Sequence, residues 1–231
     1  ENKMKHKRIY LSLFFFFAVI TGVNMLANDF AFKNLSTEPK HEAAAKKVFK
    51  KYADTNYDES LAVDVASAIE VSGMNKFGDI LIAQIALESS CVHQKKGKLV
   101  GSKTGAKGLC QITPTTAFQK VRYELKDSDI ALMKKLGANP PNWSRMEYSK
   151  SIFGKKFVPK RNRKLVIAWL EDPKNSIALW IVLMKGYETK YGIDGALVAY
   201  HDGEGGLKKV KSPSKHWYVK KTISIINKEN I

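Results

Sequence analysis

The sequence predicts a mostly α-helical domain with one small loop or hairpin segment. Apolar residues recur at helical spacing along most of the chain and strand patterns are few, whereas residues 92–107 are rich in lysine and glycine and lack apolar periodicity. The chain has 231 residues, 44% hydrophobic and 26% charged, which is enough for one domain with its own core and a terminal appendage. We expect this domain at 46–231, preceded by a targeting segment at 1–27 and a polar linker at 28–45.

Residues 1–27 have the pattern of a targeting segment. Four basic residues lie within the first eight positions, and an apolar run with four consecutive phenylalanines follows them. This order predicts a secretory signal peptide or a retained N-terminal membrane anchor. The run up to Ala27 nearly reaches the length of a membrane span, and Met25 stands where a cleavage site prefers a small residue. Both alternatives export the rest of the chain, and the second anchors it in the inner membrane.

Two helices are expected in the first half of the domain. Apolar residues repeat at helical spacing over 60–71, and Gly73 permits the left-handed backbone that ends many helices. Residues 80–87 are apolar on nearly every face, which indicates a helix buried on all sides.

Later helices have clear starting residues. They are expected at Thr113-Pro114, at Asp172-Pro173 and near Trp217. Gly192 is expected to end the apolar helix that begins after Asp172, and a short helix at 195–200 is expected to break at the glycine-rich stretch 203–206. Residues 120–164 show few periodic runs, and we interpret them either as a lid or partner-docking element or as an inert surface insertion.

Glu88 stands at the end of the apolar run at 80–87. A carboxyl group beside packed apolar side chains is desolvated, which raises its pKa, and a raised pKa suits a general acid that works near neutral pH. A single glutamate near a helix end is more often a cap or an ion-pair partner, so this position alone identifies no function.

The chain carries a formal net charge of +17 with a pI of about 9.7, which favours anionic polymers such as nucleic acid, acidic lipid headgroups or the bacterial envelope. Nucleic acid is disfavoured, because the basic residues are scattered and no recognition motif is present. The two cysteines, Cys91 and Cys110, permit one disulfide in an exported protein, and the alternative is a pair of free buried thiols.

Three segments stand in a characteristic order: Glu88-Ser89-Ser90, then 101–114 with Gly108-Leu109-Cys110-Gln111, then 196–205 with Ala199-Tyr200-His201-Asp202-Gly203. This order resembles the lytic transglycosylases of the soluble-lytic-transglycosylase type, which have an α+β lysozyme-like fold. Their pattern is Glu-Ser, a Gly-Leu-Met-Gln segment and Ala-Tyr-Asn-x-Gly. The resemblance extends over roughly residues 60–221.

The resemblance implies cleavage of the β-1,4 bond between N-acetylmuramic acid and N-acetylglucosamine in peptidoglycan, without cofactor or metal. In this family one glutamate protonates the glycosidic oxygen and then takes the proton of the sugar's C6 hydroxyl, which closes a 1,6-anhydro ring. Glu88 matches that glutamate. Ordinary glycosidases use two carboxyl groups. A second one has no evident place in this sequence, although Asp202 is a candidate.

The resemblance assigns roles to further residues. Ser102 and Gln111 match residues that contact the sugar, and Thr113 stands where the family often has a methionine that lines the cleft. Tyr200 matches a tyrosine whose hydroxyl orients the catalytic glutamate, and His201 replaces the usual asparagine after it. Without the resemblance, Tyr200 reads as a core aromatic residue, and Ser102 and Gln111 read as loop residues.

The tryptophans divide into two pairs. We expect Trp143 and Trp217 to be exposed and to stack on sugar faces, and Trp169 and Trp180 to pack in the core.

Two alternatives compete with the transglycosylase. The first is a goose-type muramidase, which has the same fold but hydrolyses the bond. The second is a wall-binding subunit of a secretion or pilus machine, which catalyses no reaction. We expect the protein to be located in the periplasm and to bind peptidoglycan there. Its expected role is to open the wall locally for an envelope-spanning secretion, conjugation or phage machinery.

Overall fold

The computed structural model describes residues 40–103, 105–143, 149–150, 156–157 and 160–231. The described chain is mostly helical, as predicted. Its α-helices are α2 (Glu42–Ala53), α3 (Glu59–Ser72), α4 (Gly78–Ser89), α5 (Pro114–Gln119), α6 (Asp127–Lys135), α7 (Lys160–Leu170), α8 (Pro173–Leu207) and α9 (Trp217–Glu229). Short helical turns lie at Asp54–Asn56, Asn75–Phe77, Lys120–Glu124 and Pro213–Lys215.

Two small antiparallel hairpins complete the fold. The first pairs β1 (Gln94–Lys95) with β2 (Lys98–Leu99), inside the stretch where a loop or hairpin was expected. Lys96 and Gly97 connect these strands with φ of 52° and 71°, as a two-residue hairpin turn requires. The second pairs β3 (Ser149–Lys150) with β4 (Lys156–Phe157).

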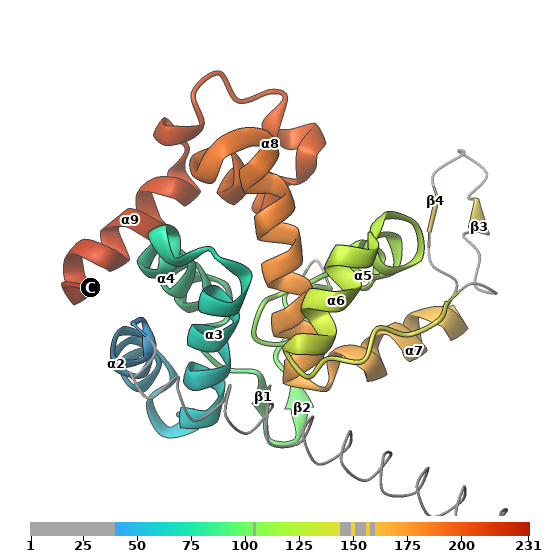
Figure 1. Cartoon of the computed structure of the whole chain (residues 1–231), viewed down its shortest axis with the longest axis horizontal. Helices are drawn as coiled ribbons and strands as arrows, with labels where there is room; N and C mark the ends of the chain where they lie inside the picture. Colours follow the sequence, from blue (N-terminus) through green and yellow to red (C-terminus); the bar gives the residue numbers. More distant parts are fainter. Residues whose placement is uncertain (1–39, 104, 144–148, 151–155, 158–159) are drawn as a thin grey trace, which may run out of the picture. The chain divides into compact units, whose positions relative to one another are not determined.

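Helix α8 runs through the middle of the unit formed by residues 39–231 (Figure 1). It contacts α3 and α9 as well as α6 and α7. Asp172 caps its first turn by accepting a hydrogen bond from the backbone N–H of Lys174 at 2.9 Å. Gly192 and Gly203 have φ of 68° and 74°, so the expected breaks occur at these glycines.

The core surrounds α4, as its sequence predicted. All residues from Leu81 to Ala86 are buried, including the polar Gln84. Helix α3 ends at Ser72, and Gly73 follows with φ of 78°, which confirms the predicted left-handed cap.

The linker expected at 28–45 is too long at its C-terminal end. Helix α2 begins at Glu42, and Ala45 is fully buried. The reason lies in local propensity: alanine, glutamate and lysine are strong helix formers, and Lys46 forms an i,i+4 ion pair with Glu42 at 2.5 Å. The targeting segment expected at 1–27 lies outside the described residues. In the part that the structure describes, no helix combines the length and hydropathy needed to cross a membrane.

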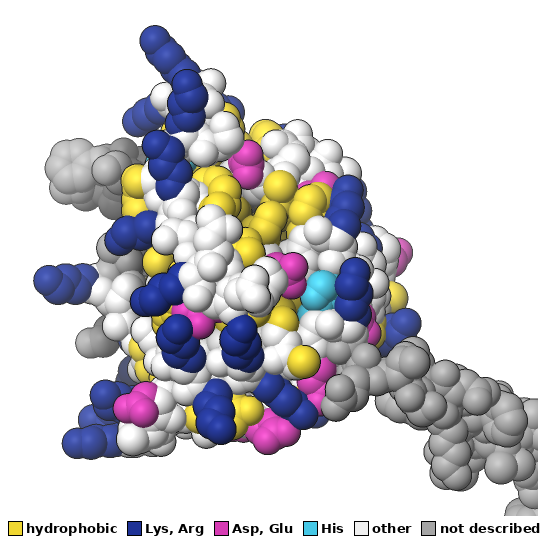
Figure 2. Space-filling model, turned by 90° about the vertical axis from the view of Figure 1, so that its left-hand side faces the viewer, with side chains coloured by type: hydrophobic (Ala, Val, Ile, Leu, Met, Phe, Trp, Pro, Cys, Tyr) yellow, Lys and Arg dark blue, Asp and Glu magenta, His cyan; other side chains and the backbone are white. Residues whose placement is uncertain are grey.

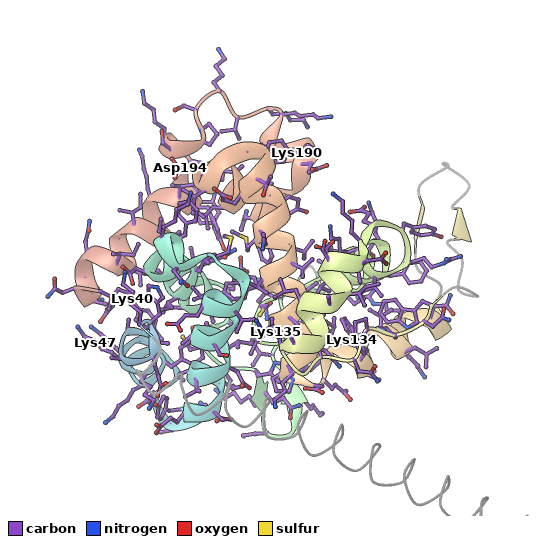
Figure 3. All side chains as sticks on the ribbon, viewed as in Figure 1. Lys40, Lys47, Lys134, Lys135, Lys190 and Asp194 are labelled. Carbon is purple, nitrogen blue, oxygen red and sulfur yellow. The ribbon has the colours of Figure 1, made fainter. Side chains whose placement is uncertain are left out.

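Basic side chains are spread over the surface. Lysine and arginine side chains are scattered over the face shown in Figure 2, with fewer acidic side chains between them. The lysines labelled in Figure 3 are distributed over the fold, with Lys40 just before α2, Lys47 on α2, Lys134 and Lys135 at the end of α6, and Lys190 on α8.

Candidate active site

Glu88 lies in the last turn of α4, where the buried helix reaches the surface of the core. One turn earlier, the Gln84 side chain accepts a hydrogen bond from the indole N–H of Trp180 at 3.1 Å, which fixes α4 against α8. Ser90 follows with φ of 54° and ψ of 37°, and its N–H donates to the carbonyl of Ala86 at 3.0 Å. The helix therefore ends at Ser89, one residue after Glu88, and Glu88 is partly buried.

The hydroxyl of Tyr218 donates a hydrogen bond to Oε1 of Glu88. The sequence assigned this role to Tyr200, and that assignment is wrong. Tyr218 is buried in the first turn of α9, which packs against α4. The sequence does not reveal that α9 packs against α4, so it could not identify Tyr218 as the partner of Glu88. The one feature that could have drawn attention to Tyr218 is an aromatic residue at the start of an amphipathic helix.

Tyr200 instead supports the loop that carries Gln111. Its hydroxyl donates to the backbone carbonyl of Cys110 at 2.5 Å. Burial raises the pKa of Tyr200, and the negative charge of the Glu88 carboxylate raises it further, so Tyr200 stays protonated beside the glutamate.

Burial raises the pKa of Glu88 above its usual value, as predicted. The hydrogen bond from Tyr218 and a positive charge on His201 both favour the ionised carboxylate and lower the pKa, but their effect is smaller. Because of desolvation, the Glu88 carboxyl group stays neutral up to a higher pH than an exposed glutamate does. When it ionises, the Tyr218 hydroxyl still donates a hydrogen bond to the carboxylate.

His201 belongs to a cluster of aromatic and charged groups beside Tyr218. Its ring lies 4.5 Å from the Tyr218 ring and 4.9 Å from the Trp217 ring, measured between centroids. Asp202 contacts two imidazoles, with Oδ1 at 2.5 Å from Nδ1 of His201 and Oδ2 at 3.2 Å from Nε2 of His216. Both carboxylate oxygens of Asp202 are therefore engaged.

Residues 107–112 form a tight loop. The backbones of Lys107 and Ile112 bond to each other in both directions, at 3.0 and 3.2 Å. Gly108 has φ of 69°, and a Cβ there would lie 2.8 Å from the ring of His93, so the glycine is required.

Sequence reasoning missed His93, which holds this loop. Its Nδ1 accepts from the N–H of Leu109 at 3.1 Å, and its Nε2 lies 3.0 Å from the carbonyl of Glu171. A neutral ring that carries its proton on Nε2 satisfies both contacts, and burial lowers the pKa of His93 in agreement with that form. A lone histidine in a lysine-rich loop gave no pattern from which to predict this clamp.

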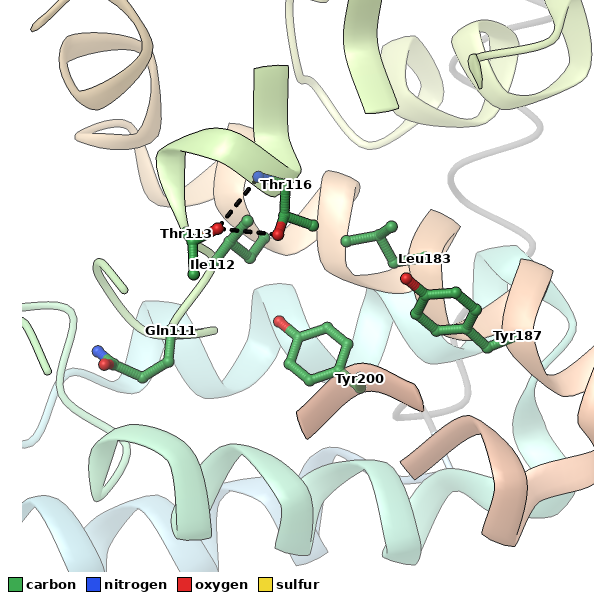
Figure 4. A pocket seen from close by; sticks show the side chains of 7 residues that line it. All are labelled: Gln111, Ile112, Thr113, Thr116, Leu183, Tyr187 and Tyr200. Carbon is green, nitrogen blue, oxygen red and sulfur yellow. Dashed lines mark hydrogen bonds between the residues drawn. The ribbon is translucent and has the colours of Figure 1, made fainter. Parts of the chain in front are cut away.

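Gln111, Thr113 and Tyr200 line one pocket, together with Ile112, Thr116, Leu183 and Tyr187 (Figure 4). Thr113 also caps α5, because its Oγ1 accepts from the N–H of Thr116 at 3.0 Å. The side-chain N–H groups of Gln111 donate within the loop, to the carbonyl of Gly108 at 2.8 Å and that of Val100 at 3.3 Å.

A second pocket is also lined by Thr116, Leu183 and Tyr187, together with Lys120, Glu124 and Glu204, so the two pockets adjoin, and we call them together the groove. Ser102 is not among the residues that line either pocket. Its Oγ accepts from the N–H of Ala106 at 3.1 Å and so links these two residues of the loop. The structure thus joins Gln111, Thr113 and Tyr200 in one groove, and Glu88, Tyr218 and His201 in a second cluster that Tyr200 adjoins.

The degree of burial expected of the tryptophans is confirmed for Trp169, Trp180 and Trp217 and is wrong for Trp143. Trp217 is 49% exposed beside His201, whereas Trp143 is buried and stacks on Phe118 at 5.9 Å. Trp180 is fully buried as predicted, and Trp169 is partly buried and donates to the carbonyl of Asn139 at 2.8 Å.

Cys91 and Cys110 are free thiols, so the expected disulfide is absent from the structure. Both side chains are fully buried in the apolar core, where each acts as a small hydrophobic group. Burial raises the pKa of both thiols.

Among the described residues, no group of three histidine, cysteine, aspartate or glutamate side chains is arranged to hold a metal ion. No protein-family model, curated protein or solved structure matches the chain.

Proposed function

We propose that the protein is a peptidoglycan lytic transglycosylase, with Glu88 as its general acid and base. The observation that carries the proposal is the Glu88–Tyr218 pair, in which a desolvated carboxyl group has a fixed hydrogen-bond donor on one oxygen. The adjoining groove and the motif order quoted above support it. The substrate would be the β-1,4 bond between N-acetylmuramic acid and N-acetylglucosamine.

The reaction follows from the two protonation states of Glu88. Because Tyr218 holds Oε1, Oε2 is the oxygen available to carry the proton. Neutral Glu88 would give this proton to the glycosidic oxygen, and the C1–O bond breaks with its electron pair leaving on that oxygen. The C6 oxygen of the muramic acid then attacks C1, and its proton passes to the Glu88 carboxylate, which restores the acid. Tyr218 would stabilise the carboxylate between the two steps.

Ring closure needs no second carboxylate, whereas hydrolysis normally does. Asp202 was the candidate for that second group, and each of its oxygens contacts a histidine ring. A neighbouring carboxylate would raise the pKa of Glu88, but burial is the cause that raises it and no described carboxylate contributes. These observations favour the transglycosylase over a goose-type muramidase. In the cell, we propose that the enzyme acts in the periplasm, where it opens the wall locally for a secretion, conjugation or phage machinery.

Clearance of peptidoglycan by purified protein tests the proposal. Wild-type protein should clear the wall, and Glu88→Gln should lose at least about 100-fold in rate, since general acid–base catalysis contributes about 10²–10⁴-fold. Glu171→Gln is the matched control, because its side chain is exposed outside the cluster. Equal clearance by wild type and Glu88→Gln would refute the role of Glu88, and wall binding without clearance would favour the non-catalytic subunit.

A further inference from the structure

The segment between α8 and α9 concentrates positive charge. Six lysines occur in the fourteen residues from 208 to 221, and this stretch has no acidic residue, whereas 39 basic residues in 231 would give between two and three. We call these six side chains the lysine rim: Lys208, Lys209, Lys211, Lys215, Lys220 and Lys221. All six are exposed, and none forms an ion pair with another described residue.

The backbone holds the rim in place. The N–H groups of Lys208 and Lys209 donate to the carbonyls of Glu204 and Gly206 at 3.2 and 2.9 Å, so α8 continues into the segment. A helical turn at Pro213–Lys215 follows, and the buried side chain of Tyr218 fixes the start of α9. In Figure 2, lysine side chains project from the top, where Figure 1 places this segment. Six like charges on one fixed segment repel each other, and an anionic ligand would relieve that repulsion.

The rim adjoins the candidate catalytic group. Tyr218, which bonds Glu88, lies between Lys215 and Lys220 in the sequence. Trp217 beside it is 49% exposed, and Nζ of Lys221 lies 5.3 Å from the centroid of its ring. The exposed Trp217 ring can pack against an apolar face of a ligand, and the lysine ammonium groups beside it can bind carboxylates of the same ligand.

We propose that the lysine rim binds the carboxylates of the peptide stems of peptidoglycan, so that the protein prefers glycan strands with stems to strands without them. The inference rests on the proposed transglycosylase function. A polymer with its scissile bond at Glu88 would place its own side groups near the start of α9, which carries Tyr218. Because salt screens electrostatic attraction beyond about 8 Å at physiological ionic strength, the lysine rim attracts only anionic groups that come this close. A membrane is the less favoured ligand, since a bilayer on the rim would cover the approach to Trp217 and Tyr218.

The test compares two substrates: intact glycan strands with stems, and the same strands after an amidase has removed the stems. At low salt, wild-type protein should cut the strands with stems at least about tenfold faster, and added salt should reduce the preference. A variant with Lys208, Lys209, Lys211 and Lys215 changed to Gln should cut both substrates at similar rates. The matched control changes four exposed lysines on α2, α6 and α7 to Gln, namely Lys50, Lys134, Lys135 and Lys164, and should keep the preference.

Each contrary outcome has a distinct meaning. If wild type cuts neither substrate, the proposed function fails and the inference falls with it. If wild type cuts both substrates equally, or the rim variant keeps the preference, the lysine rim does not bind peptide stems. The proposed transglycosylase function is unaffected by either result. Loss of binding to anionic phosphatidylglycerol vesicles in the rim variant, with the stem preference intact, would identify the rim as a membrane surface and overturn the inference. Equal melting temperatures for the three proteins would exclude misfolding as the cause.

Discussion

Tyr218 donates a hydrogen bond to Oε1 of Glu88 across 130 residues of sequence. The contact joins α9 to the end of α4, two helices that pack directly against each other. It opposes the effect of burial, because desolvation favours the neutral carboxyl group and the phenol hydroxyl favours the carboxylate. A residue that acts first as an acid and then as a base must be able to adopt both the neutral carboxyl form and the carboxylate form.

Tyr218→Phe should move the alkaline limb of the pH–activity profile to higher pH. The substitution removes a bond that lowers the pKa of Glu88, so the proton is held to higher pH. A hydrogen bond to a charged group contributes about 1.5–3 kcal/mol, so the rate at the optimum should fall about 10- to 100-fold. Tyr200→Phe is the control, because its hydroxyl bonds the Cys110 carbonyl and its loss should leave the limb in place. An unchanged limb in Tyr218→Phe would contradict the role of the bond.

Glu88→Gln should be more stable than wild type at neutral pH. The folded-state pKa of Glu88 lies above its unfolded value, so its contribution to stability is complete below the unfolded pKa and is lost as the pH rises through the folded pKa. Glutamine carries no charge to bury, so the melting temperature of the variant should exceed that of wild type at pH 7 and the difference should shrink towards pH 4. A variant that melts below wild type at pH 7 would show that the carboxylate is not desolvated.

His93→Ala should lower stability by about 1–3 kcal/mol, since the buried N–H of Leu109 loses its acceptor. The folded-state pKa of His93 is lowered, so its contribution is complete above the unfolded pKa and is lost as the pH falls through the folded pKa. Denaturant titrations should therefore show the largest deficit near pH 7 and a smaller one near pH 5. Gln94→Ala is the control, because its side chain reaches the same Glu171 carbonyl from an exposed position. Equal losses in both variants would exclude a specific clamp.

Neither cysteine should react with an alkylating agent in the folded protein. Both thiols are buried and their pKa values are raised, so little thiolate is present and access is blocked. After unfolding without a reductant, mass spectrometry should show two added alkyl groups. A protein that gains them only after reduction would contain the disulfide that the structure lacks.

Helices were predictable from the sequence where local chemistry determines them. Asp172 and Thr113 cap their helices through side-chain oxygens, and Gly73, Gly192 and Gly203 adopt the positive φ that marks a helix end or break. The burial of α4 followed from its uninterrupted apolar run.

Contacts between distant segments were not predictable in this way. The sequence contains two tyrosines near the candidate site, and the packing of α9 on α4 decides which of them reaches Glu88. Glu42 and the three alanines that follow it have high helical propensity, which the assignment of these residues to the linker overlooked. The burial of Trp143 depends on Phe118 and on Trp169, whose ring centroid lies 5.5 Å away.

The products of a peptidoglycan digest in ¹⁸O-labelled water test the central claim most directly. If Glu88 acts first as acid and then as base on the C6 hydroxyl, mass spectrometry should find muramic acid ends that are one water lighter than reducing ends and carry no ¹⁸O. Glu88→Gln should yield none of them. Reducing ends that contain ¹⁸O, without anhydro ends, would contradict ring closure and identify a hydrolytic muramidase.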